Sequence, residues 1–200
     1  MKKFFLCLIV ILMSILSLSA QQWRLGAKVG ANWSRIAKMP NGDAKQKMGW
    51  NIGVVTSYAL NDYVAFQGEL LYSQRGSNDL MVVGPLDMAG FDLTSHFVDL
   101  PLMIQFYPFR SENNFSLYAG LQPSFLLKES LDYEPAESTL SYGARKDFEF
   151  SLLFGCGYAF ANGLFLEGRY VLGMTNLYED YPDMMRGRSI QMAIGYCFRL

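Results

Sequence analysis

From residue 23 onward, apolar residues alternate with polar or small residues at a period of two. The first run places Trp23, Leu25 and Val29 on one face and Arg24 and Lys28 on the other. Seven similar runs follow, within residues 50–60, 64–73, 97–106, 116–125, 148–160, 164–173 and 190–199. A period of two is that of a β-strand with two unlike faces. The pattern predicts an all-β chain of eight antiparallel strands.

The connections between these runs alternate in length. Three are short or turn-like, at 61–62, 107–114 and 161–163, and four are long, at 34–48, 76–95, 128–147 and 176–188. Short turns at one end and long loops at the other are typical of an up-and-down transmembrane β-barrel. In that arrangement both termini lie at the short-turn end, which faces the periplasm.

The apolar face points toward lipid in this interpretation. It carries no charged residue, although charged residues make up 18% of the chain. A soluble eight-stranded barrel, the alternative, would turn its apolar face inward and a charged face to water. Aromatic residues also gather at both ends of the apolar face, as expected for interfacial girdles. The girdle residues are Trp23, Trp33, Trp50, Tyr58, Tyr72, Phe106, Phe125, Phe160 and Phe198.

The first twenty residues have the layout of a secretory signal peptide. A basic start, Met1–Lys3, precedes the apolar run 4–16 and the small residues before Ala20. We expect cleavage near Ala20, which leaves residues 21–200 as one barrel domain in the outer membrane. A retained membrane anchor is the alternative. The net charge of −1 gives no reason to expect nucleic-acid binding.

Charged residues of both signs occur on the face predicted to line the lumen. They are Arg24, Lys28, Glu69, Asp99, Glu167 and Arg169. An eight-stranded barrel has an interior that side chains fill, and buried charges need partners. We therefore expect a lumen plugged by an ion-pair network and a monomer that is not an open pore. A narrow gated channel for small ions or solutes is the alternative.

Catalysis would have to involve His96, the single histidine of the chain. It lies beside Ser95 and three residues before Asp99, at the loop end of a strand. A Ser-His-acid site needs these side chains within hydrogen-bond reach of one another. No metal-ligand cluster, phosphate loop or nucleotide motif is present, so we expect no cofactor and no enzyme. A lipid-modifying enzyme is the alternative.

The long loops offer a second place for function. Segment 76–95 is unusually apolar, and either extends two strands as a hairpin above the membrane or binds a surface partner or polysaccharide; the extension is favoured. Segment 128–147 is rich in charge and is the other candidate surface. Within the strands, Pro101 and Pro123 each lack a backbone N–H, so we expect a local irregularity at both.

Three segments resemble a known family. They are Glu-Leu-Leu-Tyr-Ser-Gln-Arg-Gly at 69–76, Val-Asp-Leu-Pro-Leu-Met-Ile-Gln-Phe at 98–106, and Leu-Glu-Gly-Arg-Tyr at 166–170 followed by Gly-Met-Thr-Asn-Leu at 173–177. In this order they resemble the PorT-like outer-membrane β-barrel family of gram-negative bacteria. The resemblance implies an eight-stranded outer-membrane protein. The ending departs from the family pattern, because Phe198 is followed by Arg199 and Leu200.

Overall fold

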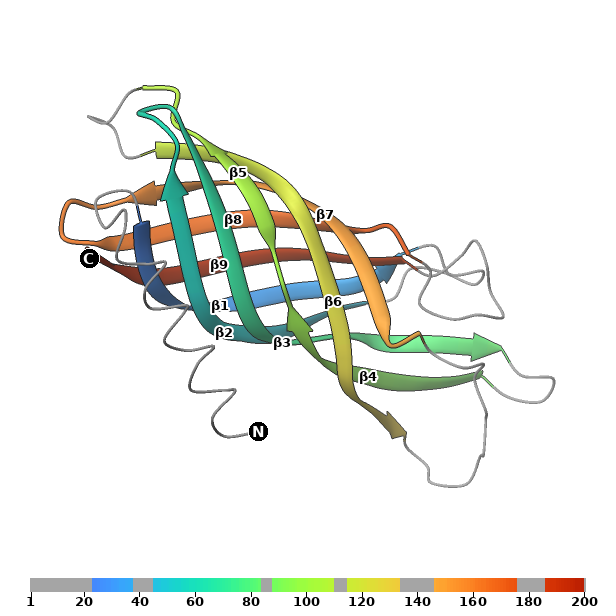
Figure 1. The fold of residues 1–200 in the computed structure, drawn as a ribbon. Helices are drawn as coiled ribbons and strands as arrows, with labels where there is room; N and C mark the ends of the chain where they lie inside the picture. Colours follow the sequence, from blue (N-terminus) through green and yellow to red (C-terminus); the bar gives the residue numbers. More distant parts are fainter. Residues whose placement is uncertain are drawn as a thin grey trace, which may run out of the picture.

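The computed structural model describes residues 23–37, 45–83, 88–109, 115–133, 146–175 and 186–199. These form nine antiparallel strands: β1 (Trp23–Ala37), β2 (Lys45–Ala59), β3 (Val64–Val83), β4 (Met88–Asp99), β5 (Leu102–Phe106), β6 (Phe115–Tyr133), β7 (Phe148–Ala159), β8 (Leu164–Gly173) and β9 (Arg186–Arg199). The first strand, β1, pairs with β2 on one side and with the last strand, β9, on the other. Because β2 also pairs with β3, the sheet closes into a barrel (Figure 1). The predicted signal peptide lies outside the described residues.

Strands β4 and β5 are two parts of one barrel strand. Both pair with β3, where Leu71 faces Asp99 and Gly68 faces Leu102. The two pairs are three residues apart on β3 and three residues apart along β4 and β5, so the register with β3 is unchanged across the interruption. Pro101 interrupts the strand because it cannot donate a ladder hydrogen bond. The predicted eight-stranded barrel and the irregularity at Pro101 are both confirmed.

The irregularity predicted at Pro123 occurs on one side of its strand only, where the pairing of β6 with β4 ends at Ser124 and the pairing with β5 resumes at Leu121. Pro123 lies opposite Phe150 in an unbroken β6–β7 register. Its carbonyl accepts a hydrogen bond from the Leu100 N–H at 2.9 Å. In an antiparallel ladder the N and O of one residue face the same neighbouring strand. The N–H that Pro123 lacks would therefore have faced Leu100, beside the interruption at Pro101.

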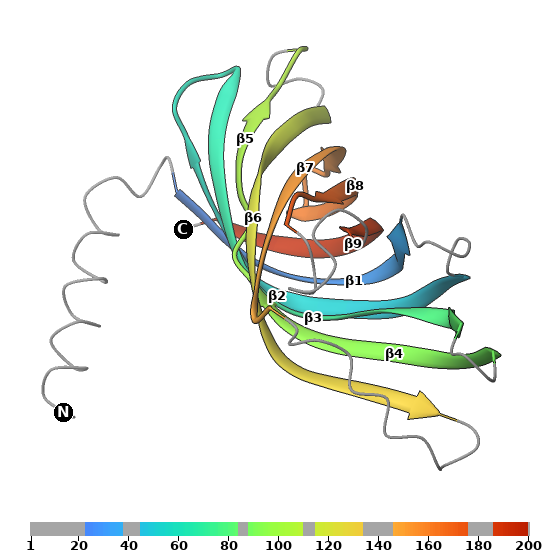
Figure 2. The ribbon, with the colours of Figure 1, turned by 90° about the vertical axis from the view of Figure 1, so that its right-hand side faces the viewer.

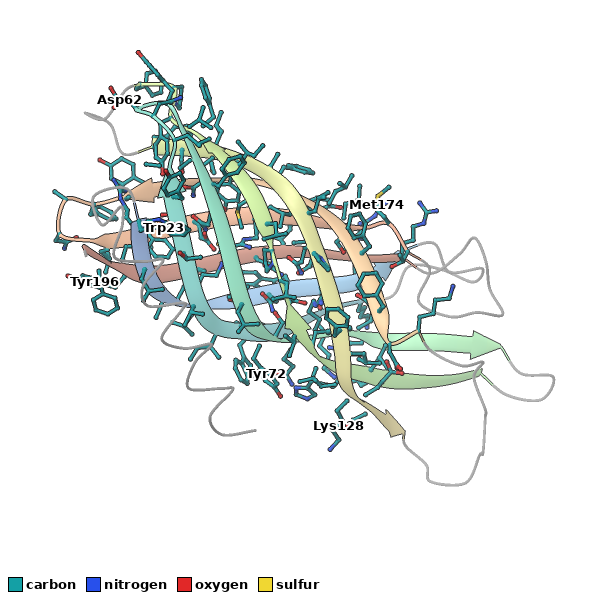
Figure 3. All side chains as sticks on the ribbon, in the orientation of Figure 1. Trp23, Asp62, Tyr72, Lys128, Met174 and Tyr196 are labelled. Atoms are coloured by element: carbon teal, nitrogen blue, oxygen red, sulfur yellow. The ribbon has the colours of Figure 1, made fainter. Side chains whose placement is uncertain are left out.

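The two faces of the barrel wall differ as the alternation predicts. Small and polar side chains such as Asn32, Ser73 and Gln122 are fully buried inside the barrel. Large apolar side chains such as Val29 and Ile52 are about half exposed on the outside. Figure 3 shows outward-pointing side chains all along the wall. The polar face thus lines the lumen and the apolar face forms the outer surface.

The short turns lie at the same end of the barrel as the start of β1 and the end of β9, the first and last described strands. In the first turn, the Asn61 Oδ1 accepts hydrogen bonds from the backbone N–H groups of Tyr63 and Val64. In another, Gly163 adopts a φ of 93°, which a side chain would disfavour. The outermost described pair of β1 and β9 joins Arg24 and Arg199 at this end. Within the described ranges, no helix is long and apolar enough to cross a bilayer.

Strands β3 and β4 continue past the rest of the wall at the opposite, long-loop end. Their pairing persists to Val83 and Met88, and β4 pairs with β6 as far as Phe91 and Tyr133. Figures 1 and 2 show this hairpin projecting beyond the barrel. The favoured extension of both strands is confirmed for residues 76–83 and 88–95, and the predicted turn between them lies outside the described residues.

Side chains of β1 close a gap in the wall between β2 and β3. The β2–β3 ladder shifts register between Gln46 and Asn51. Beside this shift, the Asn32 amide donates to the Gln74 carbonyl, and the Ser34 hydroxyl both donates to and accepts from the Gly76 backbone. Lumen side chains therefore supply hydrogen bonds that the ladder lacks.

Candidate functional site

Four charged side chains meet in the lumen nearer the short-turn end. The Lys28 ammonium lies 2.6 Å from Glu69 and 2.5 Å from Glu167. The Arg169 guanidinium holds Glu69 through two hydrogen bonds of 2.9 Å and also contacts Glu167. All four residues are buried. The two cations and two carboxylates cancel, which is what a site shielded from water requires. We call these four residues the central charge cluster.

A row of amides connects the central charge cluster to the short-turn mouth. The Gln67 amide donates to Glu69 at 2.6 Å, and the Gln105 amide donates to Gln67 at 2.6 Å. The Tyr107 hydroxyl then donates to Gln105 at 2.9 Å. Tyr107 lies in the turn after β5, where burial raises the pKa of its phenol. The phenol therefore keeps its proton and stays a donor.

A group of apolar side chains packs beside the central charge cluster, on the lumen face of β5, β6, β7 and β8. It consists of Met103, Tyr118, Leu153 and Val171, all of them buried. The Tyr118 hydroxyl donates to the Gly168 carbonyl at 3.2 Å, so its polar end is satisfied. These side chains fill lumen space on the β5–β8 side of the charged residues.

A second charged group lies nearer the long-loop end of the lumen, where Arg75 follows Glu69 by six residues on β3. The Arg75 guanidinium donates to Asp99 at 2.7 Å and lies 3.8 Å from Glu149. It also lies 4.1 Å from the centre of the Phe97 ring, within cation–π range. Sequence reasoning placed Asp99 in the lumen but missed Arg75 and Glu149. The alternation could have found both, because each occupies a lumen position of its strand.

Arg24 does not belong to either group. It was predicted to join the network, but its side chain is exposed. It borders the small cavity at the short-turn mouth together with Tyr107 and Cys197. Water reaches an arginine at the mouth of a barrel, so Arg24 needs no buried carboxylate. The lumen thus brings together Lys28, Glu69, Glu167 and Arg169, places Asp99 with Arg75, and leaves Arg24 apart.

The candidate catalytic residues lie on opposite faces of the wall. Ser95 and Asp99 are buried in the lumen, where Ser95 donates to Glu129 at 3.2 Å. His96 shares a hydrogen bond of 2.9 Å with the Tyr72 hydroxyl, in an exposed position. Figure 3 shows Tyr72 on the outside of the barrel. Neighbours in a strand point to opposite faces, so these three residues do not form a Ser-His-acid site.

His96→Ala should therefore change little. We expect a loss of no more than about 1 kcal/mol in the free energy of unfolding, because one exposed hydrogen bond disappears. Mass spectrometry should show the same lipid A species in cells that produce the variant or the unaltered protein. Altered acylation of lipid A would instead revive the lipid-modifying alternative.

The aromatic residues predicted to form girdles gather at the two ends of the outer face. Trp23 and Tyr58 lie in contact at the short-turn end, with ring centres 5.0 Å apart and ring planes tilted by 50°. Trp50 and Tyr72 lie in contact at the long-loop end, with ring centres 5.4 Å apart and ring planes tilted by 43°. Such pairs are cross-strand neighbours on one face, which adds stability to the sheet. The band of aliphatic side chains lies between these ends.

Comparisons with known proteins agree with this architecture. The family model described as outer membrane protein beta-barrel domain matches residues 19–179. Ail, the attachment invasion locus protein of Yersinia pestis, superposes with a TM-score of 0.56 at 15% identity, over 88% of this chain and 99% of that one. OprG from Pseudomonas aeruginosa superposes with a TM-score of 0.52 at 12% identity, over 90% and 97%.

Neisserial surface protein A is similar as well, with a TM-score of 0.50 at 15% identity over 88% and 97% of the two chains. No curated protein matches the sequence significantly. At these identities the structural similarities show a shared fold, while the family match covers most of the chain. The chain belongs to the outer membrane protein beta-barrel domain family and is a small barrel of the outer membrane.

Proposed function

We propose that this protein is a sealed barrel with a structural or surface-interaction role, acting at its long-loop end and not through its lumen. The observation that carries the proposal is the charge-balanced cluster of Lys28, Glu69, Glu167 and Arg169, with buried apolar side chains packed beside it. Moving ions through this region would require separating paired, desolvated charges. The lumen therefore acts as a plug.

The projecting β3–β4 hairpin supports the surface role. The outer part of β3 and β4 extends beyond the rest of the wall, and β6 pairs with β4 there as far as Phe91 and Tyr133. Among the proteins with this fold, Ail has a structure in complex with the heparin analogue sucrose octasulfate. By analogy of fold alone, a surface partner or polysaccharide is the ligand class that we propose.

We also propose that residues 1–20 direct export and are removed near Ala20. The short turns and both termini face the periplasm, and the barrel is a monomer without enzyme activity or cofactor. The three segments that resemble PorT-like barrels support membership of that narrower group.

Conductance measurements in planar lipid bilayers test the plug. The unaltered protein and Glu69→Ala should both leave the membrane current at baseline, because Glu69 is one of several lumen-filling side chains. A general porin reconstituted in the same way provides the positive control. Discrete current steps from the unaltered protein would contradict the plug and favour the gated-channel alternative.

A further inference from the structure

Three arginines gather on the outer face of the wall at the long-loop end. Arg35 and Arg188 are direct partners in the β1–β9 ladder. Their neighbours Ser34 and Ser189 are buried in the lumen, so the two arginines belong to the opposite face. Arg186 precedes Arg188 by two residues on β9 and therefore shares that face. All three arginines are partly buried. We call them the arginine cluster.

The arginine cluster lies just beyond the aromatic girdle. Trp33 and Ile190 are partners in the same two strands and lie on the same outer face. Arg35 and Arg188 follow two residues nearer the long loops, which is about 7 Å along the strands. Tryptophan residues mark the level at which acyl chains give way to headgroups. The guanidinium groups therefore lie at the level of the lipid headgroups, where charge on the outer face of a barrel costs little.

No carboxylate in this part of the wall balances the arginine cluster. Strands β1, β2 and β9 contain no acidic residue, and the one in β8, Glu167, is buried in the central charge cluster. Among the described residues, none of the three arginines makes an ion pair. Like charges directly opposite each other in a sheet repel. An anion beside Arg35 and Arg188 would turn this repulsion into attraction.

Donors within the arginine cluster are unused. The Nε atoms of Arg186 and Arg188 are shielded from solvent and have no hydrogen-bond partner among the described residues. A guanidinium group carries five N–H donors in a fork that matches the oxygens of a phosphate group. A shielded donor without an acceptor is unfavourable, so the cluster lacks an acceptor that a ligand would supply.

A shallow apolar hollow on the same outer face favours a lipid as the source of this acceptor. Its border includes Ala31, Cys156 and Met192, with Gly168 between the last two. Gly168 has no side chain to fill the space, and a Cβ there would meet no atom within 4 Å. Met192 lies four residues along β9 from Arg188, about 13 Å away. A lipid held at the arginine cluster can lay an acyl chain toward this hollow, whereas a soluble anion gains nothing from it.

We propose that the arginine cluster binds the headgroup phosphate monoester of a phosphorylated glycolipid in the leaflet at the long-loop end. A monoester carries a charge of about −1.5 to −2 near neutral pH, which matches two or three arginines better than the single charge of a phosphodiester. Its oxygens also accept bidentate hydrogen bonds from guanidinium groups. The assignment to the outer leaflet rests on the proposed function, in which the long loops face outward. The binding itself rests on the arginine cluster alone.

Native mass spectrometry of the folded full-length barrel, released from nonionic detergent micelles, tests the proposal. The probes are lipid A with both of its phosphates, the same lipid A after phosphatase treatment, and phosphatidylglycerol, whose single charge is a phosphodiester. We expect the barrel to retain one molecule of phosphorylated lipid A. The other two lipids should bind about tenfold more weakly, because each arginine beside an anionic headgroup contributes to binding.

Variants locate the binding. Arg35→Gln/Arg188→Gln should weaken the binding of phosphorylated lipid A by about tenfold, because two guanidinium groups are lost. Lys128→Gln is the matched control, since Lys128 is an exposed cation at the same end of the outer face, on β6 (Figure 3). It should leave the affinity unchanged. The shift in gel mobility on boiling verifies that each variant is folded.

Three outcomes would overturn the site. One is equal binding of lipid A with and without its phosphates. Another is an equal loss of affinity in Lys128→Gln, which would show attraction to positive charge in general. The third is displacement of lipid A by millimolar glucose 1-phosphate, because a soluble monoester would then be the occupant. A micelle has no leaflets, so these results do not depend on which end of the barrel faces outward or on whether the lumen conducts. A failure here is therefore distinct from a failure of the proposed function.

Discussion

Glu69→Ala should lower the free energy of unfolding by about 3–5 kcal/mol, as found when one partner of a buried ion pair is removed. The substitution deletes one of two carboxylates in the central charge cluster. Lys28 and Arg169 would then share Glu167 alone, leaving one buried positive charge uncompensated. The Gln67 amide would also lose its acceptor. Urea unfolding in lipid vesicles, followed by tryptophan fluorescence, measures the change.

A compensated variant separates charge imbalance from lost packing. Lys28→Met/Glu69→Gln removes one charge of each sign and keeps an acceptor for Gln67, so it should recover most of the stability lost in Glu69→Ala. Asp147→Ala, at an exposed position, should stay within about 0.5 kcal/mol of the unaltered protein. If Glu69→Ala were as stable as the unaltered protein, water in the lumen would be solvating the charges.

The architecture could be predicted because one physical requirement governs every strand. Each strand has one face toward lipid and one toward the lumen, so its side chains alternate in polarity over its whole length. That alternation placed Lys28, Glu69 and Glu167 on the lumen face correctly. It also explains why Ser95 and His96, neighbours in the chain, lie on opposite faces.

Partners inside the lumen could not be predicted in the same way. A period of two says which face a residue occupies, but the depth at which it meets another strand depends on register and on the stagger of the closed barrel. Lys28 and Glu167 lie 139 positions apart in the chain and still meet. Asp99 pairs with Arg75, a residue just beyond the predicted strand. Arg24, on the correct face, lies too near the mouth to need a partner.

Gly155→Ala should destabilise the barrel by about 3 kcal/mol, the upper end of the usual cost of overpacking. Gly155 faces the lumen opposite Arg169. A Cβ there would lie 2.3 Å from the Gly168 carbonyl oxygen, 2.9 Å from the Arg169 Cα and 2.9 Å from the Tyr118 ring. Two of these atoms belong to backbone, so the strands themselves would have to move apart. Urea unfolding in vesicles should show the loss.

Gly168→Ala provides the matched control on the adjacent strand. Gly168 points outward, and a Cβ at this position would meet no atom within 4 Å. The added methyl group would face lipid, and alanine restricts the unfolded chain more than glycine does, so stability should stay the same or rise slightly. Equal losses in the two variants would mean that glycine is required for strand flexibility in general. A loss confined to Gly155→Ala would show that close approach of β7 and β8 holds Arg169 and Tyr118 in the plug.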